Sequence, residues 1–260
     1  MKLSSSRRLQ KIVDFLEENN YVKAKEMSER FEVSMETIRK DLIYLEEKGI
    51  VKKEYGGASL ALTGIEKNME FRKYHEDDKS EIARLAAQML REYHSMILDS
   101  GSTCLTCVKY INLLPSMDIV TNSVDAFRQL NGNQHNVFLT PGKKREKNHA
   151  LTGNWTEKYL KSVHVDVCLL GTSGLLSGSG PTSHSYQELS AKQIMIEQSD
   201  LVFVLADSSK FLEKGLHTVA EWEKIDGIIT DHNLSPGLYS KFCKKVPIYV
   251  AREEENEENR

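Results

Sequence analysis

The feature that most constrains this fold is the alternation of apolar and amphipathic segments after about residue 80. The segments between the apolar runs, such as 154–162, 186–198 and 236–244, predict helices. Nearly continuous apolar strands that alternate with helices are typical of a mainly parallel sheet covered on both faces. The chain is therefore expected to contain an α/β domain, with Trp155, Tyr159 and Leu160 in its core. The predicted strands are residues 95–99, 118–122, 136–140, 165–171, 200–207, 226–231 and 247–251.

Small polar residues follow five of these predicted strands. In parallel sheets, ligands bind beyond the carboxyl ends of the strands. The segment DSGST, residues 99–103, follows the first strand and opens a helix. Its backbone N–H groups and its hydroxyls can surround a phosphate, and Gly101 lets the backbone approach closely. The loops at 121–123, 141–143, 171–174 and 207–210 are of the same kind, so the sequence predicts a polar, phosphorylated ligand at this edge of the sheet.

The first sixty residues predict a small helical domain. Apolar residues from Leu9 to Leu16 recur with helical spacing, and a second, shorter helix spans Ala24 to Phe31. Ser34 is expected to cap a third helix that buries Ile38, Leu42 and Leu45 and closes at Gly49. Three short helices with a tight turn before the third predict a helix-turn-helix.

The outward face of the third helix has the residue types that contact DNA. Residues near the start of a recognition helix reach base edges in the major groove. Arg39 and Lys40 can contact guanine edges or phosphates. The following segment, IVKKEYGGA, predicts a hairpin wing that places Lys52 and Lys53 against phosphates. The predicted DNA-contacting residues are Ser34, Met35, Glu36, Thr37, Arg39, Lys40, Lys52, Lys53 and Tyr55.

The stretch VSMETIRKDLIYLEEKGIVKKEYGGA resembles the DeoR-type winged helix. That family has the pattern S-x-x-T-I-R-[RK]-D-L-x-x-L-E-x-x-G, followed by a basic wing that ends in H-G-G-A. The resemblance covers residues 4–59 and implies a helix-rich winged helix-turn-helix domain. Two departures bear on the operator sequence: Glu36 brings a negative charge near DNA, and Tyr55 replaces the usual His.

The order of loops in the second part resembles the DeoR sensor domain, which is related to ribose-5-phosphate isomerase. The family marks are D-S-G-S-T, T-N-S, L-G-T-S-G, Q-E-L-S-A-K and D-S-S-K-F, across about residues 75–252. The resemblance implies that residues 99–103 hold the phosphate of a sugar phosphate. This sequence departs from the family at Lys143, where a second glycine is usual, and at Pro181, where leucine is usual. The predicted effector-binding residues are Asp99, Ser100, Gly101, Ser102, Thr103, Asn122, Ser123, Gly142, Lys143, Gly171, Glu188 and Lys210.

An enzyme is the main alternative to a regulator. An isomerase needs an acid or base beside the sugar carbons, and related isomerases have an acidic D-G-A-D-E stretch where this chain has residues 170–174, LGTSG. The phosphate loop is present and those carboxylates are absent, which favours a sensor. Glu188, Lys192 and Lys210 leave an isomerase open as the runner-up. A redox-responsive regulator using Cys104 and Cys107 is a further alternative, although two small residues packing a helix is the simpler interpretation. His184 is expected to face solvent.

The remaining sequence features limit location and partners. No apolar run approaches the roughly 20 residues of a membrane span, and the N-terminus lacks the pattern of a signal peptide. Four irregularly spaced cysteines do not form a disulfide framework, so a reducing cytoplasm is expected. The net charge of −3 means that the DNA prediction rests on the placement of charges.

The resemblance implies a homo-oligomeric repressor of carbohydrate uptake or catabolism genes, with operator DNA and a phosphorylated sugar as partners and no cofactor or metal. Residues 60–74 are assigned to a linker, with one short element around Glu66–Tyr74, and residues 253–260 to a disordered acidic tail.

Overall fold

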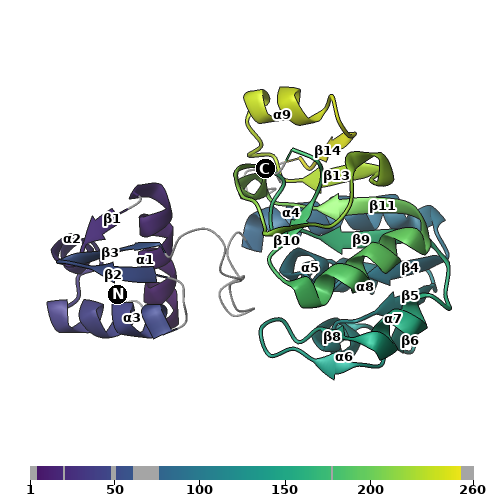
Figure 1. Cartoon of the computed structure of the whole chain (residues 1–260), viewed down its shortest axis with the longest axis horizontal. Coiled ribbons are helices and arrows are strands. Elements are labelled where there is room, and N and C mark those ends of the chain that lie inside the picture. The colour runs from purple at the N-terminus through teal and green to yellow at the C-terminus, as the bar shows by residue number, and fades with distance from the viewer. Residues whose placement is uncertain (1–4, 20, 48–50, 61–75, 177, 253–260) are drawn as a thin grey trace, which may run out of the picture. The chain divides into compact units, whose positions relative to one another are not determined.

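The computed structural model describes residues 5–19, 21–47, 51–60, 76–176 and 178–252. The chain divides into two compact units, residues 1–74 and 75–260 (Figure 1). Each unit has its own hydrophobic core. The acidic tail and the predicted element around Glu66–Tyr74 lie outside the described residues, as does the predicted linker apart from Leu60. In the described part of the chain, no helix is both long and apolar enough to cross a membrane.

The N-terminal unit is a three-helix domain with a small antiparallel sheet. Its core is formed by apolar residues from all three helices and the sheet, including Ile12, Met27, Ile38 and Leu45. The sheet has the strand order β1-β3-β2, so the predicted wing hairpin is extended by a third strand. The elements are α1 (Ser5–Asn19), β1 (Tyr21–Lys23), α2 (Ala24–Arg30), α3 (Met35–Glu47), β2 (Val51–Glu54) and β3 (Gly57–Leu60). Three helices and a wing confirm the predicted winged helix-turn-helix.

Glycines determine the geometry of the wing. Glu54 pairs with Gly57, which leaves Tyr55 and Gly56 as a two-residue turn. Gly56 has φ of +80°, a conformation that favours glycine. A Cβ at Gly57 would lie 2.2 Å from the carbonyl oxygen of Val22, so only glycine allows β3 to approach β1 this closely.

The C-terminal unit is built on a seven-stranded sheet with the order β14-β13-β11-β9-β4-β5-β6. Every pairing in this sheet is parallel. The strands are β4 (Ser95–Leu98), β5 (Asp118–Thr121), β6 (Asn136–Leu139), β9 (Val165–Gly171), β11 (Ser199–Leu205), β13 (Gly227–Thr230) and β14 (Ile248–Val250). All seven predicted strands are therefore confirmed, and the unit has the predicted α/β class.

Helices cover both faces of this sheet, as Figure 1 shows. On β9, Val167 and Leu169 pack on one face, while Cys168 and Leu170 pack on the other, as the two-residue period of a strand requires. The first face is covered by α4 (Glu76–Met89), α5 (Ser102–Ile111) and α6 (Val124–Gln129). The second is covered by α7 (Asn154–Leu160), α8 (Tyr186–Glu197) and α9 (Pro236–Phe242).

Several elements differ from the sequence prediction. Helix α4 begins at Glu76, with three acidic residues in its first turn that interact favourably with the helix dipole. Two short antiparallel pairs were not predicted, because two residues are too few to show a period. They are β7 (Lys143–Lys144) with β8 (Leu151–Thr152), and β10 (Thr182–Ser183) with β12 (His217–Thr218). Three 3₁₀ turns, η2 (Leu90–Glu92), η3 (Ser208–Leu212) and η4 (Trp222–Lys224), complete the unit.

The prediction that Trp155 belongs to the core is wrong. Its side chain is 71% exposed. In α7 the buried stripe is set by Thr156 and Leu160, four residues apart on one face. Trp155 precedes this stripe and points to the surface, whereas Tyr159 packs partly against the core as expected.

Candidate functional site

The third helix begins at the predicted cap. The backbone N–H of Thr37 donates to Ser34 Oγ at 3.1 Å, and the hydroxyls of Ser34 and Thr37 lie 2.8 Å apart. Ile38, Leu42 and Leu45 face the core of the unit, as predicted. The burial of this stripe fixes which side chains of α3 face outward.

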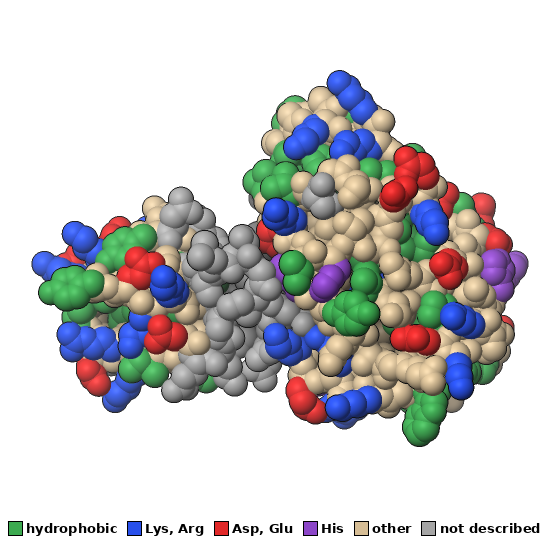
Figure 2. Space-filling view, in the orientation of Figure 1, with side chains coloured by type: hydrophobic (Ala, Val, Ile, Leu, Met, Phe, Trp, Pro, Cys, Tyr) green, Lys and Arg blue, Asp and Glu red, His purple; other side chains and the backbone are tan. Residues whose placement is uncertain are grey.

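Near its start, the outward face of α3 carries two cations and one carboxylate. Glu36, Arg39 and Lys40 are exposed. Lys40 Nζ lies 3.8 Å from Glu36 Oε1, so this ion pair spans one turn of the helix. Met35 was also predicted to contact DNA, but its side chain is half-buried and packs against the core. Figure 2 shows basic and acidic side chains interspersed on the visible face of this unit.

The wing presents the other residues predicted to contact DNA. Lys52 and Lys53 are exposed on β2, and Tyr55 is fully exposed at the turn. Glu46 at the end of α3 accepts from the backbone N–H of Lys53 at 2.9 Å and pairs with its ammonium at 3.9 Å. The hydroxyl of Tyr21 donates to the carbonyl of Tyr55 at 3.0 Å. The wing is thus fastened to α3 and to β1 at its two ends.

A buried ion pair joins the first and third helices. Arg8 Nε donates to Asp41 Oδ2 at 2.6 Å and Arg8 Nη2 donates to Oδ1 at 3.0 Å. Hydrogen bonding to Asp41 raises the pKa of Arg8 above its ordinary value, against the effect of burial. The sequence gives no signal for this pair, because Arg8 is one of several basic residues near the N-terminus. Asp41 therefore positions α3 and does not face outward.

The loop after β4 lies where it was predicted, at the carboxyl edge of the sheet. Asp99 is almost fully buried, and its Oδ2 accepts from the backbone N–H of Gly171 at 2.9 Å and from Lys192 Nζ. Lys192 also donates to the carbonyl of Gly171 at 2.9 Å. Gly101 faces Gly171 so closely that a Cβ on Gly101 would lie 3.3 Å from the Gly171 Cα. These contacts bind the ends of β4, β9 and α8 together.

Neighbouring carboxylates keep the buried Lys192 side chain protonated. Burial alone would lower the pKa of this ammonium, but the carboxylates of Asp99 and then Glu188 outweigh burial, so the pKa lies above its ordinary value. Because Asp99 is committed to Lys192 and Gly171, its carboxylate positions the loop, and the loop's hydroxyls and N–H groups remain the groups suited to a phosphate. Lys192 was missed as a partner of Asp99, although its spacing four residues after Glu188 places both on one face of α8.

A second buried cluster adjoins the same loop. Ser100 Oγ lies 3.4 Å from Glu188 Oε1. Asn148 Nδ2 donates to Ser100 Oγ at 3.2 Å and also to Glu188 Oε1. Arg145 Nη1 lies 3.1 Å from Glu188 Oε2. Arg145 and Asn148 come from the β7–β8 hairpin, a segment without any periodic pattern, so the sequence offered no signal for them.

The other predicted effector residues occupy varied positions along this edge. Ser102 and Thr103 form the first turn of α5. Ser123 Oγ caps α6 by accepting from Ala126 N at 3.1 Å. Asn122 Nδ2 donates to the carbonyl of Leu151 at 3.4 Å, while its buried Oδ1 has no hydrogen-bond partner among the described residues.

The remaining three predicted residues lie in turns around the edge. Gly142 has φ of +155°, and a Cβ there would lie 2.2 Å from Thr156 Oγ1, so no larger residue fits. Lys143 is exposed in β7. Lys210 Nζ pairs with Glu213 Oε2 at 2.8 Å. The structure thus brings Asp99, Ser100, Gly101, Gly171 and Glu188 together most closely.

The two cysteines of α5 are buried packing residues. Burial raises the pKa of the Cys104 thiol well above its ordinary value, and the Asp99 carboxylate raises it further. Burial likewise raises the pKa of Cys107. Because the thiolate is the reactive form, neither thiol is suited to redox sensing. The described residues also contain no cluster of acidic, His or Cys side chains able to hold a metal ion.

The end of β9 has none of the acidic chemistry of an isomerase. Thr172 Oγ1 accepts from the backbone N–H of Gly174 and of Thr182, both at 3.2 Å. His184 is half-buried, and its backbone N–H donates to Ser173 Oγ at 3.1 Å. The expectation that His184 faces solvent is therefore only partly met. This loop is held together by its own hydroxyls.

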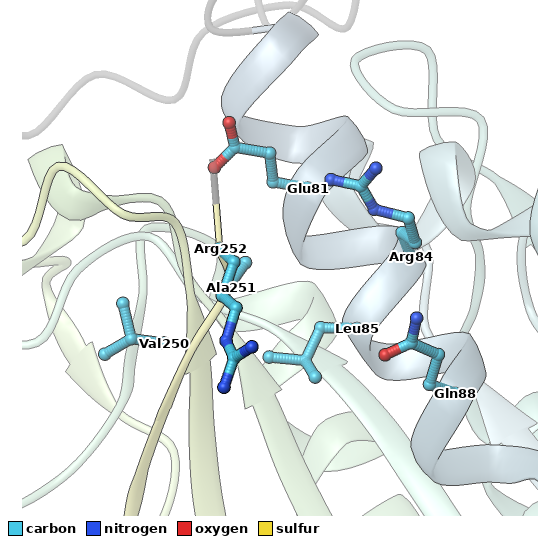
Figure 3. A pocket seen from close by; sticks show the side chains of 7 residues that line it. All are labelled: Glu81, Arg84, Leu85, Gln88, Val250, Ala251 and Arg252. Atoms are coloured by element: carbon cyan, nitrogen blue, oxygen red, sulfur yellow. The ribbon is translucent and has the colours of Figure 1, made fainter. Parts of the chain in front are cut away.

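A pocket of about 540 Å³ lies away from these clusters, between α4 and the segment after β14 (Figure 3). Its lining includes the charged side chains of Glu81, Arg84 and Arg252. None of the predicted effector residues lines this pocket. Glu81 is itself engaged, since its Oε2 lies 2.7 Å from His232 Nδ1.

Comparisons with known proteins agree with both units. The profile of the "DeoR-like helix-turn-helix domain" matches residues 8–63 and that of the "DeoR C terminal sensor domain" matches residues 74–232. The chain is 32% identical to the HTH-type transcriptional repressor GlcR of Bacillus subtilis over 86% of its own length and 87% of that protein. It is 28% identical to the HTH-type transcriptional regulator GolR of Listeria innocua, over 94% of this chain and 98% of that protein. It is 27% identical to the glycerol-3-phosphate regulon repressor of Escherichia coli K12, over 85% of this chain and 88% of that protein.

Similar solved structures include ribose 5-phosphate isomerase A of Methanocaldococcus jannaschii, at 15% identity and a TM-score of 0.39 over 52% of this chain and 54% of that one. The curated relatives named above are transcriptional regulators, which confirms the prediction of a regulator over an isomerase. The chain belongs to the DeoR family of transcriptional regulators, with a DeoR-like helix-turn-helix domain followed by a DeoR sensor domain.

Proposed function

We propose that residues 4–59 bind operator DNA through α3 and the wing. Arg39 and Lys40 are exposed near the start of a capped third helix, which is where recognition helices carry the side chains that reach base edges. Lys52, Lys53 and Tyr55 are exposed on the wing, in positions suited to phosphate contacts. Ser34 and Thr37 supply hydroxyls at the helix start, and Glu36 can accept from a cytosine amino group.

Residues 75–252 bind a phosphorylated sugar or a related metabolite in this proposal. The observation that carries it is the Asp99–Thr103 loop, in which a buried serine and a glycine lead directly into the N-terminus of α5. Helix N-termini that follow such loops bind phosphate groups. Asn122 supports the same site, because a buried amide oxygen without a partner is suited to a ligand hydroxyl.

The biological role follows from the relatives. One is a repressor of the glycerol-3-phosphate regulon and another a putative repressor of the aga operon. By analogy, this chain represses carbohydrate uptake or catabolism genes in the cytoplasm, and the effector shifts it between arrangements that hold DNA well and poorly. It acts as a homodimer or higher homo-oligomer, since a two-fold operator is matched by a two-fold protein. Residues 60–74 link the two domains and residues 253–260 form an acidic tail.

A fluorescence anisotropy titration tests both roles together. The full chain is titrated onto labelled DNA from upstream of its own gene, with and without a panel of sugar phosphates. We expect saturable binding that weakens with salt and is reversed by one phosphate ester but not by the matching free sugar. Sequence-specific binding that no ester alters would contradict the effector role and leave the DNA role intact.

Substitutions on α3 and the wing separate base reading from phosphate contact. Arg39→Ala is expected to weaken binding to the preferred operator by about 1–3 kcal/mol and to relax sequence preference. Lys52→Ala is expected to weaken binding to all sequences alike and to reduce the salt slope by about 1. Lys11→Ala, an exposed lysine of α1, is the control. If Arg39→Ala lowered affinity equally for operator and random DNA, Arg39 would not be a base-reading residue.

A further inference from the structure

The β7–β8 hairpin places Asn148 against the candidate phosphate loop and Arg145 against Asn148 and Glu188. Arg145 Nη1 donates to Asn148 Oδ1 at 2.9 Å, and Arg145 Nε donates to Gln187 Oε1 at 3.2 Å. With the ion pair to Glu188, the guanidinium spans the start of α8 and the hairpin. Its side chain is only 9% exposed and that of Glu188 only 8%. An arginine this deeply placed at a ligand edge is unusual, because arginine is mostly exposed in proteins.

Four charged side chains beside the candidate phosphate loop form two ion pairs. Lys192 balances Asp99, and Arg145 balances Glu188. Ser100 Oγ lies 3.4 Å from Glu188 Oε1, so a phosphate bound to Ser100 would lie beside the Glu188 carboxylate. Two like charges in a buried site disfavour each other strongly. A phosphate can therefore bind at Ser100 only if a cation turns toward it.

Arg145 is better suited than Lys192 to make that turn. Lys192 is fixed between the Asp99 carboxylate and the Gly171 carbonyl, both of which hold the ends of the central strands. The contacts of Arg145 described above include one carboxylate and two neutral amide oxygens. A guanidinium has five N–H donors in a planar fork that matches phosphate oxygens two at a time.

We propose that Arg145 is the side chain that recognises the effector's phosphate monoester, and that it exchanges the Glu188 carboxylate for the phosphate oxygens. The proposal rests on the effector site proposed above and identifies a recognition residue of that site. Because Asn148 contacts both Ser100 and Arg145, the hairpin carries both groups to the ligand together. The backbone N–H of Arg145 donates to the carbonyl of Ala150 at 2.8 Å, so the residue is held on the hairpin when its side chain turns.

Calorimetric titration of the full chain tests this exchange. The probes are inorganic phosphate, glycerol 3-phosphate, ribose 5-phosphate and glucose 6-phosphate at constant ionic strength. Arg145→Met is expected to weaken the binding of the best probe by about 10- to 100-fold, as for the loss of hydrogen bonds between charged groups. Arg145→Lys is expected to recover only part of that loss, because the fork is gone. Arg128→Met, an exposed arginine on α6, is the matched control and should bind as the unmodified protein does.

The exchange makes an opposite prediction for Glu188. Glu188→Gln releases Arg145 from its carboxylate, so inorganic phosphate, which has no sugar hydroxyls, should bind several-fold more tightly. If Glu188→Gln weakened phosphate binding as Arg145→Met does, Glu188 would position Arg145 and the exchange would be wrong. Equal binding by Arg145→Met and the unmodified protein would overturn the role of Arg145 while the effector site stands. Failure of every probe to bind the unmodified protein would overturn both.

Discussion

Lys192→Met should destabilise the C-terminal unit by about 3–5 kcal/mol, the usual result of removing one partner of a buried ion pair. The substitution leaves the Asp99 carboxylate buried without its cation, at the point where β4, β9 and α8 meet. Both tryptophans of the chain, Trp155 and Trp222, lie in this unit. Denaturant unfolding followed by tryptophan fluorescence therefore reports on it alone. Lys158→Met, an exposed lysine of α7, should change the midpoint little.

The double variant Lys192→Met with Asp99→Asn distinguishes a buried charge from lost packing. Removing both charges should restore most of the stability, because replacing a buried ion pair by neutral groups is often nearly neutral. A double variant as unstable as Lys192→Met alone would mean that packing of the lysine stem, and not the unpaired carboxylate, causes the loss.

The same pair predicts a loss of stability at alkaline pH. The native pKa of Lys192 lies above its ordinary value because of Asp99 and Glu188, against the effect of burial. Its contribution is therefore complete below the unfolded-state pKa, about 10.4 for lysine, and is lost as the pH rises through the native pKa. The unmodified protein should lose stability over that range more steeply than the double variant does.

Asp41→Ala should impair DNA binding even though Asp41 faces the interior. The substitution leaves the half-buried Arg8 without its carboxylate partner between α1 and α3, at a cost of up to about 3 kcal/mol, the lower end for a buried pair. A domain of some 55 residues has roughly 3–8 kcal/mol of total stability, so the N-terminal unit should be strongly destabilised. Circular dichroism should show an early loss of helix, while the tryptophan transition of the other unit keeps its midpoint.

A surface ion pair provides the control for Asp41. Lys25 and Glu29 lie 3.9 Å apart on α2 with most of both side chains exposed, and such pairs contribute little. Glu29→Ala should leave the helix transition and DNA affinity nearly unchanged. If Asp41→Ala retained full helix content but lost DNA binding, Asp41 would act on DNA more directly than its burial suggests.

Periodicity was sufficient to predict most of the fold. The seven strands each have a run of apolar residues long enough to recognise, and Ser34, an N-cap residue, indicates the start of α3. Elements of two residues, such as β7 and β10, have no period to detect. Trp155 was assigned to the core because a large apolar residue in a short helix resembles a core residue, and only the position of Thr156 and Leu160 shows otherwise.

The candidate site could be predicted only in its backbone. The loop at 99–103 follows from small polar residues at a strand end, a local pattern. The partners of that loop, Asn148 and Lys192, are 48 and 93 residues away in the sequence. Contacts of this kind depend on which loops the sheet brings together. The sequence therefore indicated a candidate phosphate loop but not the charged side chains that lie around it.

The helix α5, which begins at the candidate phosphate loop, packs on α4. The helix that begins at the candidate phosphate loop buries Cys104, Cys107 and Val108 in the cluster that also contains Ile82 and Ala86 of α4. Lys109 Nζ donates to Ser80 Oγ at 3.1 Å, which joins the same two helices at the surface. Of the described elements of the C-terminal unit, α4 is the first in the chain after the DNA-binding unit. In the proposed function, a displacement of α5 by the effector would act on the helix that lies nearest in sequence to the winged domain. Substitutions between α4 and α5 that leave effector affinity intact are therefore expected to uncouple effector binding from DNA affinity.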